Sequence, residues 1–339
     1  MPYRIVHSPQ NARLKELRRV LRDPAPAITP LPSGNGREEV GPLVGIEGHR
    51  LIAEALRAGL RLHCVFAALG EEKLIENLNL PPDLEVLFLP RELLNAALST
   101  ETPQPVAALV TPPNWGWEQI FGFDSGISPL PRSQKRDRHP TDEDLSVGTP
   151  DRGHPLILVL AGLQDPGNLG TILRSAEAFG ATGIVTLPRT VNPWNPKVVR
   201  ASAGSVFRVP LVAAGADDCF ERLHSAGVKL WTTSARDAEP VNQVDLAAPA
   251  ALLIGNEGNG VAPELAARAQ GRLTVPCPGP VESLNAAVAA SVLLYEASCQ
   301  RNGANSPPSA AAGRNGKTAG FEQSTGTRRR GTPRQRSAR

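Results

Sequence analysis

The sequence predicts an α/β protein with two packed domains, and three observations support that fold class. The chain has 339 residues, enough for about two domains of roughly 150 residues each. Short apolar runs alternate with segments of helical spacing, which is typical of a mostly parallel sheet covered on both faces. Glycine and proline contribute 31 and 33 residues although 41% of the chain is hydrophobic, so the Gly- and Pro-rich stretches must lie apart from the packed parts.

Composition divides the chain into four segments. We expect packed domains at 1–110 and 155–301, a disordered linker or insertion at 111–154 and a disordered basic tail at 302–339. The linker lacks sustained periodicity and is crowded with proline, glycine and charge. Its aromatic residues can either dock on a domain or stack on bases, and we favour docking. These residues are Trp115, Trp117, Phe121 and Phe123.

Apolar spacing assigns the elements of the first domain. Ser8 can cap a helix that runs to Leu21. Four apolar side chains then share one face of that helix, namely Leu14, Leu17, Val20 and Leu21. After a proline-rich loop at 24–42, we expect strands at 43–47, 62–67, 84–89 and 106–110 and helices at 50–58 and 91–98.

The second domain alternates strands and helices again. The runs LILVLA and ALLIG are apolar throughout, as are strands buried on both faces. Strands are expected at 156–161, 183–187, 228–232, 251–254 and 272–275. Because ligands bind at the carboxyl ends of the strands in such sheets, we expect the chemistry in the loops that follow them.

Composition also excludes several classes of protein. No apolar run approaches the roughly 20 residues of a membrane helix, and Met1 leads into a charged stretch without the apolar region of a signal peptide. The four cysteines are too widely spaced for a zinc site or a disulfide framework. We therefore expect a soluble, cytoplasmic protein with reduced thiols, no metal and no membrane partner.

Charge is distributed unevenly along the chain. Residues 302–339 carry eight Lys and Arg residues against Glu322, a net charge of +7 within a total of +3, which leaves the rest of the chain at −4. Such a tail can neutralise RNA phosphates or can merely keep the protein in solution. The composition leaves both interpretations open.

The loop after the first strand of the second domain, GLQDPGNLG, opens a helix that carries Arg174. Asn168 is well placed to cap that helix, whose exposed amides could bind an anion. The spacing of Gly162, Gly167 and Gly170 does not fit a dinucleotide-binding fingerprint. A nucleotide-dependent oxidoreductase is therefore excluded.

Two later loops also carry unusual residues. GNEGNG, at 255–260, has three glycines that permit close backbone approach and one carboxylate, Glu257. The Pro/Gly-rich loop at 275–285 enters an Ala-rich helix that Ser283 can cap. Asn285 would then lie one turn inside that helix, where asparagine is a modest helix former, so a functional role is indicated.

Three segments together resemble the motifs of the SpoU (TrmH-type) RNA 2′-O-ribose methyltransferases of the SPOUT superfamily. NLGTILRSAEAFGA, LLIGNEGNGV and VPCPGPVESLNAAVAASVLLYE occur in the family's order and spacing, with KVVRASAGSVFRVP between the first two. SPQNARLKELRRVL, VGIEGHRLIAEAL and TPQPVAALV resemble the family's substrate-binding domain, which has a ribosomal-protein L30e-like fold. The resemblance covers about 1–110 and 155–301, although Pro105 and Cys277 depart from the usual Gly and Met.

This resemblance implies a C-terminal SPOUT domain with a mostly parallel sheet and a deep trefoil knot that holds S-adenosyl-L-methionine. It also implies a homodimer that acts on RNA, with ribosomal RNA favoured by the two-domain layout. The catalytic residues that it implies are Asn168, Arg174, Glu257, Ser283 and Asn285. The cofactor-binding residues that it implies are Thr232, Thr233, Ser234, Gly255, Val275, Leu284 and Asn285.

Methylation of a ribose 2′-oxygen requires in-line attack on the methyl carbon and the removal of one proton. The family casts the arginine at Arg174 as the base, but a guanidinium with a pKa above roughly 12 is a poor proton acceptor. We therefore expect Arg174 to bind a neighbouring phosphate and to stabilise the developing alkoxide. Two alternatives remain: a catalytically inactive RNA-binding or ribosome-assembly factor of the same fold, and a tRNA 2′-O-methyltransferase.

Overall fold

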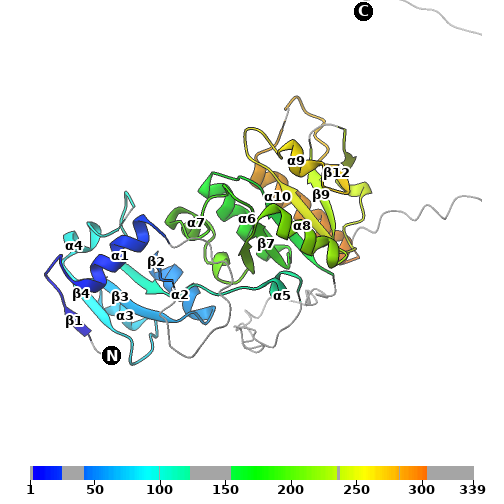
Figure 1. Ribbon diagram of the computed structural model, residues 1–339. Coiled ribbons are helices and arrows are strands. Elements are labelled where there is room, and N and C mark those ends of the chain that lie inside the picture. Colours follow the sequence, from blue (N-terminus) through cyan, green and yellow to red (C-terminus); the bar gives the residue numbers. More distant parts are fainter. Residues whose placement is uncertain are drawn as a thin grey trace, which may run out of the picture. The chain divides into compact units, whose positions relative to one another are not determined.

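The computed structural model describes residues 3–24, 42–98, 100–122, 154–234, 237–281 and 283–303. They form two sheets, the first drawn in blue and cyan and the second in green to yellow in Figure 1. No helix within these ranges is long and apolar enough to cross a membrane. Most of the expected linker and nearly all of the expected tail lie outside the described residues.

The first sheet has five strands in the order β1-β4-β3-β5-β2. β1, β4 and β3 run parallel, whereas β5 is antiparallel to both β3 and β2. The strands are β1 (Tyr3–Ile5), β2 (Val44–Glu47), β3 (Leu62–Ala68), β4 (Val86–Leu89) and β5 (Val106–Val110). The helices are α1 (Ala12–Arg22), α2 (His49–Arg57), α3 (Glu72–Glu76) and α4 (Arg91–Asn95).

Helix α1 begins later than the sequence predicts. Its N-cap is Asn11, whose Oδ1 accepts hydrogen bonds from the backbone N–H groups of Arg13 at 3.0 Å and Leu14 at 3.2 Å. The predicted cap at Ser8 is wrong, because the Ser8 hydroxyl instead accepts from the N–H of Gln10 in the preceding turn. The predicted apolar face is confirmed, since all four of its side chains are buried.

The second sheet has seven strands, all parallel, in the order β10-β12-β9-β11-β6-β7-β8. They are β6 (Leu156–Leu160), β7 (Gly183–Thr186), β8 (Leu211–Ala213), β9 (Lys229–Thr233), β10 (Glu239–Pro240), β11 (Ala250–Ile254) and β12 (Gly271–Thr274). The connecting helices are α6 (Pro166–Ala178), α7 (Pro196–Ala201), α8 (Ala216–Ser225), α9 (Pro263–Ala266) and α10 (Ala286–Arg301), with short 3₁₀ turns η1 (Ser205–Phe207) and η2 (Val241–Gln243).

The strand order reverses in the middle of the second sheet. β6, β7 and β8 step outward in one direction, whereas the later strands β9, β11 and β12 lie on the other side of β6. An open parallel sheet has its natural ligand site at such a reversal, outside the carboxyl ends of the strands. The fold therefore points to the loops after β6, β9, β11 and β12.

Both faces of the second sheet are covered, as the apolar runs predict. In β6, Leu156 and Leu158 pack in the cluster that includes leucines of α6 and α10, whereas Ile157 and Val159 pack in the cluster of α5 and α8. This alternation follows from the two-residue period of a strand. β6 is thus fixed from both sides, and the loop that follows it is held firmly.

The segment expected to be a linker contains a short helix, α5 (Trp117–Ile120). Ile120 is buried in the same cluster as β6. Trp117 stacks on Phe121 with ring centroids 5.8 Å apart, and the Arg222 guanidinium lies 5.2 Å from the Trp117 ring centroid. Trp115 is also buried. Docking is thus confirmed for these three aromatic residues, and Phe123 lies outside the described residues.

The end of α10 is anchored by one arginine. The Arg301 guanidinium donates hydrogen bonds to the carbonyl oxygens of Leu246 at 2.9 Å, Ala248 at 3.0 Å and Pro155 at 3.1 Å, and also to that of His154. These carbonyls lie just before β6 and β11. Arg301 therefore fixes α10 to the amino ends of the two central strands.

Candidate active site

Three polar side chains from separate loops form one hydrogen-bonded network. The Asn285 Nδ2 donates to the Asn168 Oδ1 at 3.0 Å, and the Asn168 Nδ2 donates to the Glu257 Oε1 at 2.9 Å. The network joins the start of α10, the first turn of α6 and the loop after β11. The structure thus brings together three of the five residues predicted to be catalytic.

The Glu257 carboxylate is held ionised by its hydrogen bonds. Besides the Asn168 amide, it accepts from the backbone N–H groups of Asp165 at 3.2 Å and Gln164 at 3.4 Å. Partial burial raises the pKa of the Glu257 carboxyl, but the hydrogen bonds from Asn168 and from backbone N–H groups outweigh burial, so the net pKa lies below its ordinary value of 4.5. Glu257 is therefore an anionic acceptor at neutral pH.

A pH dependence of stability follows from this carboxylate. A depressed pKa stabilises the folded protein fully above about pH 4.5, and that contribution is lost as the pH falls through the folded-state value. Glu257→Gln should therefore lower the free energy of unfolding by about 1 kcal/mol at pH 7, allowing for solvent screening, and the difference from wild type should shrink in acid. Urea unfolding over a pH series measures this.

Glu264→Gln is a suitable control for that series. Glu264 is exposed on α9, and its side chain makes no hydrogen bond with a described residue. Its unfolding curves should follow those of wild type at every pH. A deficit in Glu257→Gln that stayed constant in acid would contradict the assignment.

Two predicted helix caps are corrected by the structure. The N-cap of α6 is Asp165, whose Oδ1 accepts from the N–H of Asn168 at 2.7 Å, so the Asn168 side chain is free for the network. The N-cap of α10 is Asn285, not Ser283, since the Asn285 Oδ1 accepts from the N–H groups of Ala287 and Val288. Asn285 does not lie one turn inside the helix. Asn168 and Ser283 are not the caps because the side chains of Asp165 and Asn285 reach the free N–H groups of the first helical turn better.

Sequence reasoning missed Asn256, which shapes the loop that carries Glu257. Its Nδ2 donates to the Gly162 carbonyl oxygen at 2.9 Å, and its Oδ1 accepts from the Gly258 N–H at 2.9 Å. A Cβ on Gly255 would lie 2.1 Å from the Gly260 backbone, so only glycine fits there. The available signal was an asparagine that directly follows one glycine and stands two residues before another, since its side-chain groups can mimic a turn.

A cavity of about 550 Å³ adjoins the network. It is formed by the carboxyl ends of β9, β11 and β12 and by the start of α10. Seven of the predicted site residues line it: Thr233, Ser234, Gly255, Glu257, Val275, Ser283 and Leu284. Its walls also include Ile254, Leu273 and the exposed thiol of Cys277.

Two predicted site residues stand apart from this cavity. Thr232 is buried within β9, and its hydroxyl has no hydrogen-bond partner among the described residues. Arg174 is exposed on α6 and makes no hydrogen bond or ion pair with a described residue. Because Arg174 follows Asn168 by six residues, the two side chains leave α6 in different directions. The neighbouring Ser175 contacts Ser291 of α10, Oγ to Oγ, at 2.7 Å.

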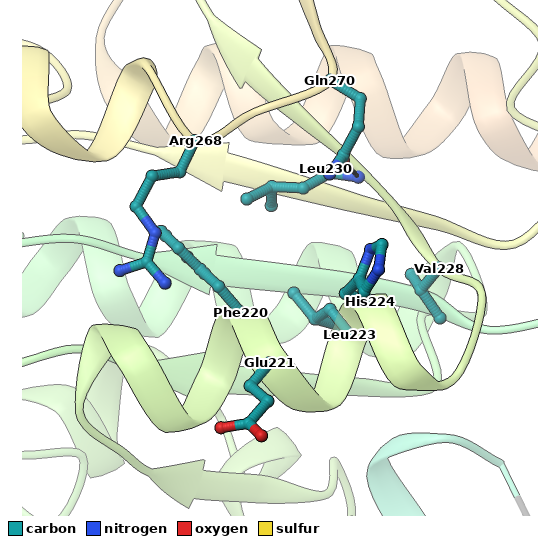
Figure 2. Close-up of a pocket in the computed structure, with 8 residues that line it drawn as sticks. All are labelled: Phe220, Glu221, Leu223, His224, Val228, Leu230, Arg268 and Gln270. Carbon is teal, nitrogen blue, oxygen red and sulfur yellow. Dashed lines mark hydrogen bonds between the residues drawn. The ribbon is translucent and has the colours of Figure 1, made fainter.

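A second cavity, of about 270 Å³, lies near the opposite ends of β9 and β12 (Figure 2). Two of its polar side chains, those of Arg268 and Gln270, are already engaged. The Arg268 guanidinium contacts Asp217 and lies 4.5 Å from the Phe220 ring centroid, and the Gln270 Oε1 accepts from the Leu230 N–H at 2.6 Å. These contacts hold α8 against the sheet, and we assign this cavity no ligand.

Comparison with known proteins identifies two family matches. The SpoU rRNA Methylase family matches residues 155–295. A second family, described as RNA 2′-O ribose methyltransferase substrate binding, matches residues 46–116. The matches fall on the second and the first sheet respectively.

Individual relatives agree with these families. A 23S rRNA (guanosine(2553)-2′-O)-methyltransferase, RlmP of Bacillus subtilis, is 30% identical over 255 residues, which cover 74% of this chain and 86% of RlmP. RlmB of Xanthomonas campestris, a 23S rRNA (guanosine-2′-O-)-methyltransferase, is 38% identical over 154 residues, covering 45% of this chain and 62% of RlmB. The crystal structure of the SpoU methyltransferase AviRb from Streptomyces viridochromogenes with AdoMet has a TM-score of 0.64 and 28% identity, covering 86% of this chain and 98% of AviRb.

The fold, the strand-end site and these likenesses define the class of the protein, which is an enzyme that methylates RNA on the ribose 2′-oxygen. The chain belongs to the SpoU rRNA methylase family.

Proposed function

We propose that this enzyme transfers a methyl group from S-adenosylmethionine to a ribose 2′-oxygen of ribosomal RNA. The observation that carries the proposal is the network of Asn168, Glu257 and Asn285 beside a cavity at the strand carboxyl ends. Relatives named as 23S rRNA methyltransferases support the choice of ribosomal RNA. A tRNA substrate is the second candidate, supported by a Synechocystis relative named as a tRNA/rRNA methyltransferase.

The cavity suits S-adenosylmethionine in size and chemistry. About 550 Å³ lies within the range of small-molecule sites, roughly 300–1,000 Å³. Ile254, Leu273 and Leu284 offer apolar surface for an adenine ring, while the glycine-rich loop 255–260 exposes backbone groups. When bound, this cofactor supplies an electrophilic methyl group. The residues that would hold it there are Thr233, Ser234, Gly255 and Val275. Thr232, which is buried in β9, would support this site from beneath.

The protein's own groups would position the 2′-hydroxyl and stabilise its charge. Glu257 holds the Asn168 amide, and Asn168 in turn accepts from Asn285, so the network has one fixed orientation. Asn168 would orient the ribose, while Ser283 and Asn285 complete the pocket. Arg174, free of carboxylate partners among the described residues, would bind a phosphate beside the reacting ribose and stabilise the developing alkoxide.

Calorimetry with S-adenosylmethionine and a methyl-transfer assay test this function together. The purified protein should bind one cofactor per chain and should methylate a large-subunit rRNA transcript. Methylation of tRNA alone would favour the second candidate. Cofactor binding without transfer to any RNA would support an inactive RNA-binding protein, and absence of cofactor binding would contradict the whole proposal.

The enzyme is further proposed to be a homodimer. α10 exposes an apolar stripe of Val288, Val292 and Tyr295, which share one side of the helix at spacings of four and three residues. An exposed apolar stripe on a helix that is also apolar on its buried side indicates an interface. The family resemblance supports a second copy of this chain as its occupant.

Val292→Asp should therefore convert the dimer to a monomer and strongly reduce methyl transfer, because burying a carboxylate in an apolar interface is costly. Light scattering and the activity assay measure the two effects. Leu69→Asp, which places the same charge at an exposed leucine in the turn after β3, should leave the dimer intact. An active wild-type monomer would contradict the proposal.

The basic tail is proposed to strengthen RNA binding without selecting the target. Deleting residues 302–339, of which 304–339 lie outside the described residues, should weaken binding of all RNAs about equally. Each phosphate contact that is lost should reduce the magnitude of the slope of log binding constant against log salt concentration by roughly 0.7. The methylated position should not change, because backbone contacts carry no sequence information. Filter binding over a salt series measures the slope, and an unchanged slope would mean that the tail is a bystander.

The remaining expectations complete the proposal. Residues 1–110 would form an L30e-like RNA-binding domain and 155–301 the SPOUT domain. The path from β12, across the ends of β9 and β11, to α10 beside α6 supports a trefoil knot. A cytoplasmic location follows from a ribosomal RNA substrate.

A further inference from the structure

The turn after β7 places an arginine where a glycine is expected. The N–H of Thr190 donates to the Leu187 carbonyl oxygen at 3.2 Å, so Pro188 and Arg189 are the central residues of the turn. Arg189 has a φ of +68°, in the left-handed region. A turn with proline first and a positive φ second is of type II, which prefers glycine or asparagine at the second position. The arginine is therefore kept there at a conformational cost.

This turn is fixed rigidly to the segment that leads into α6. The Thr190 hydroxyl donates to the Leu160 carbonyl oxygen at 2.9 Å and accepts from the Gly162 N–H at 3.1 Å. The N–H of Val191 donates to the Leu163 carbonyl oxygen at 2.7 Å. The same segment continues into the α6 turn that carries Asn168. The backbone of Arg189 is thus held at a fixed place beside the candidate active site.

The Arg189 side chain, in contrast, is unengaged. It is exposed and makes no hydrogen bond or ion pair with a described residue. Three other arginines of the same sheet region behave differently: Arg208 pairs with Glu177, Arg222 with Asp218 and Arg268 with Asp217. An unpaired guanidinium on a strained, rigid turn is consistent with a partner that is not part of this chain.

We propose that Arg189 binds a backbone phosphate of the RNA next to the target nucleotide. The inference rests on the proposed function, because it assumes that the target ribose lies at the network of Asn168, Glu257 and Asn285. A planar guanidinium can donate two parallel hydrogen bonds to phosphate oxygens. Such a contact fixes the position of the strand without reading its sequence.

The test is Arg189→Gly. Glycine adopts the positive φ without cost, so the variant should have an equal or higher Tm than wild type. Its affinity for a large-subunit rRNA transcript should nevertheless fall roughly tenfold. The slope of its log binding constant against log salt concentration should decrease by the amount expected for the loss of about one phosphate contact. Binding of S-adenosylmethionine should be unchanged, and Arg189→Lys should retain part of the affinity.

Asn79→Gly is a matched control, since Asn79 also has a positive φ, of 48°, on an exposed turn of the first sheet's domain. It should keep wild-type RNA affinity. Wild-type affinity in Arg189→Gly, or a clear loss of stability in that variant, would overturn the inference. If wild-type protein bound no S-adenosylmethionine or methylated no RNA, the proposed function would fail instead. The RNA affinities of wild-type protein and Arg189→Gly would still show whether Arg189 contacts an RNA phosphate.

Discussion

Arg174→Ala is expected to lower the turnover of RNA methylation by about 10²–10³-fold, the cost of removing one preorganised donor from a developing oxyanion. Folding should be unaffected, because the side chain is exposed and makes no hydrogen bond or ion pair with a described residue. S-adenosylmethionine affinity should also persist, since Arg174 does not line the cavity. Single-turnover kinetics with saturating cofactor and RNA measure the loss directly.

Arg174→Lys separates two roles for this side chain. A lysine retains positive charge but loses the planar pair of donors, so an electrostatic role predicts partial activity with an unchanged pH profile. A role as general base predicts a profile shifted towards the lower pKa of lysine. Turnover of Arg174→Ala within threefold of wild type would remove Arg174 from the mechanism altogether.

Asn285→Ser is expected to reduce turnover by about 10²-fold while leaving the protein nearly as stable as wild type. A serine hydroxyl can still cap α10, but it cannot replace the amide that donates to Asn168 at 3.0 Å. The network then loses its fixed orientation, and small displacements of catalytic groups are costly at this level. Methyl-transfer kinetics and thermal unfolding of the same preparation provide the two measurements.

Asn285→Ala extends this comparison by removing the cap as well. It should lose about as much turnover as Asn285→Ser and, in addition, about 1 kcal/mol of stability. Asn195→Ala is the control, because Asn195 caps α7 in the same way and lies outside the network. It should lose stability but not turnover. Equal activity of Asn285→Ser and wild type would show that Asn285 is only a helix cap.

The central strands of the second sheet could be predicted from sequence because each is a short, continuous apolar run, which is typical of a strand buried on both faces. β6 and β11 were expected within a residue of their observed ends. The strands β1 and β8, of three residues each, were not expected, since so short a segment shows no clear alternation. The antiparallel direction of β5 also leaves no mark in the pattern of its five buried residues.

The residues of the site's network could be predicted from sequence, but the contacts between them could not, because the residues lie far apart along the chain. Motif resemblance indicated Asn168, Glu257 and Asn285, yet the first pair lies 89 residues apart and the outer asparagines 117 apart. No local pattern shows that these side chains bond to one another. Helix caps failed for the opposite reason, because Ser8 and Asn11, or Ser283 and Asn285, are equally good candidates a few residues apart.

The anchoring of α10 at both ends has a consequence for the kinetics of folding. Asn285 binds a residue 117 positions earlier, and Arg301 binds carbonyls up to 147 positions earlier. Contacts across such separations form slowly, because a long loop must close before either bond is made. Helices and strands can therefore be in place while the enzyme is still inactive, and activity returns only when α10 docks. Recovery of methyl transfer during refolding should accordingly lag behind the recovery of secondary structure.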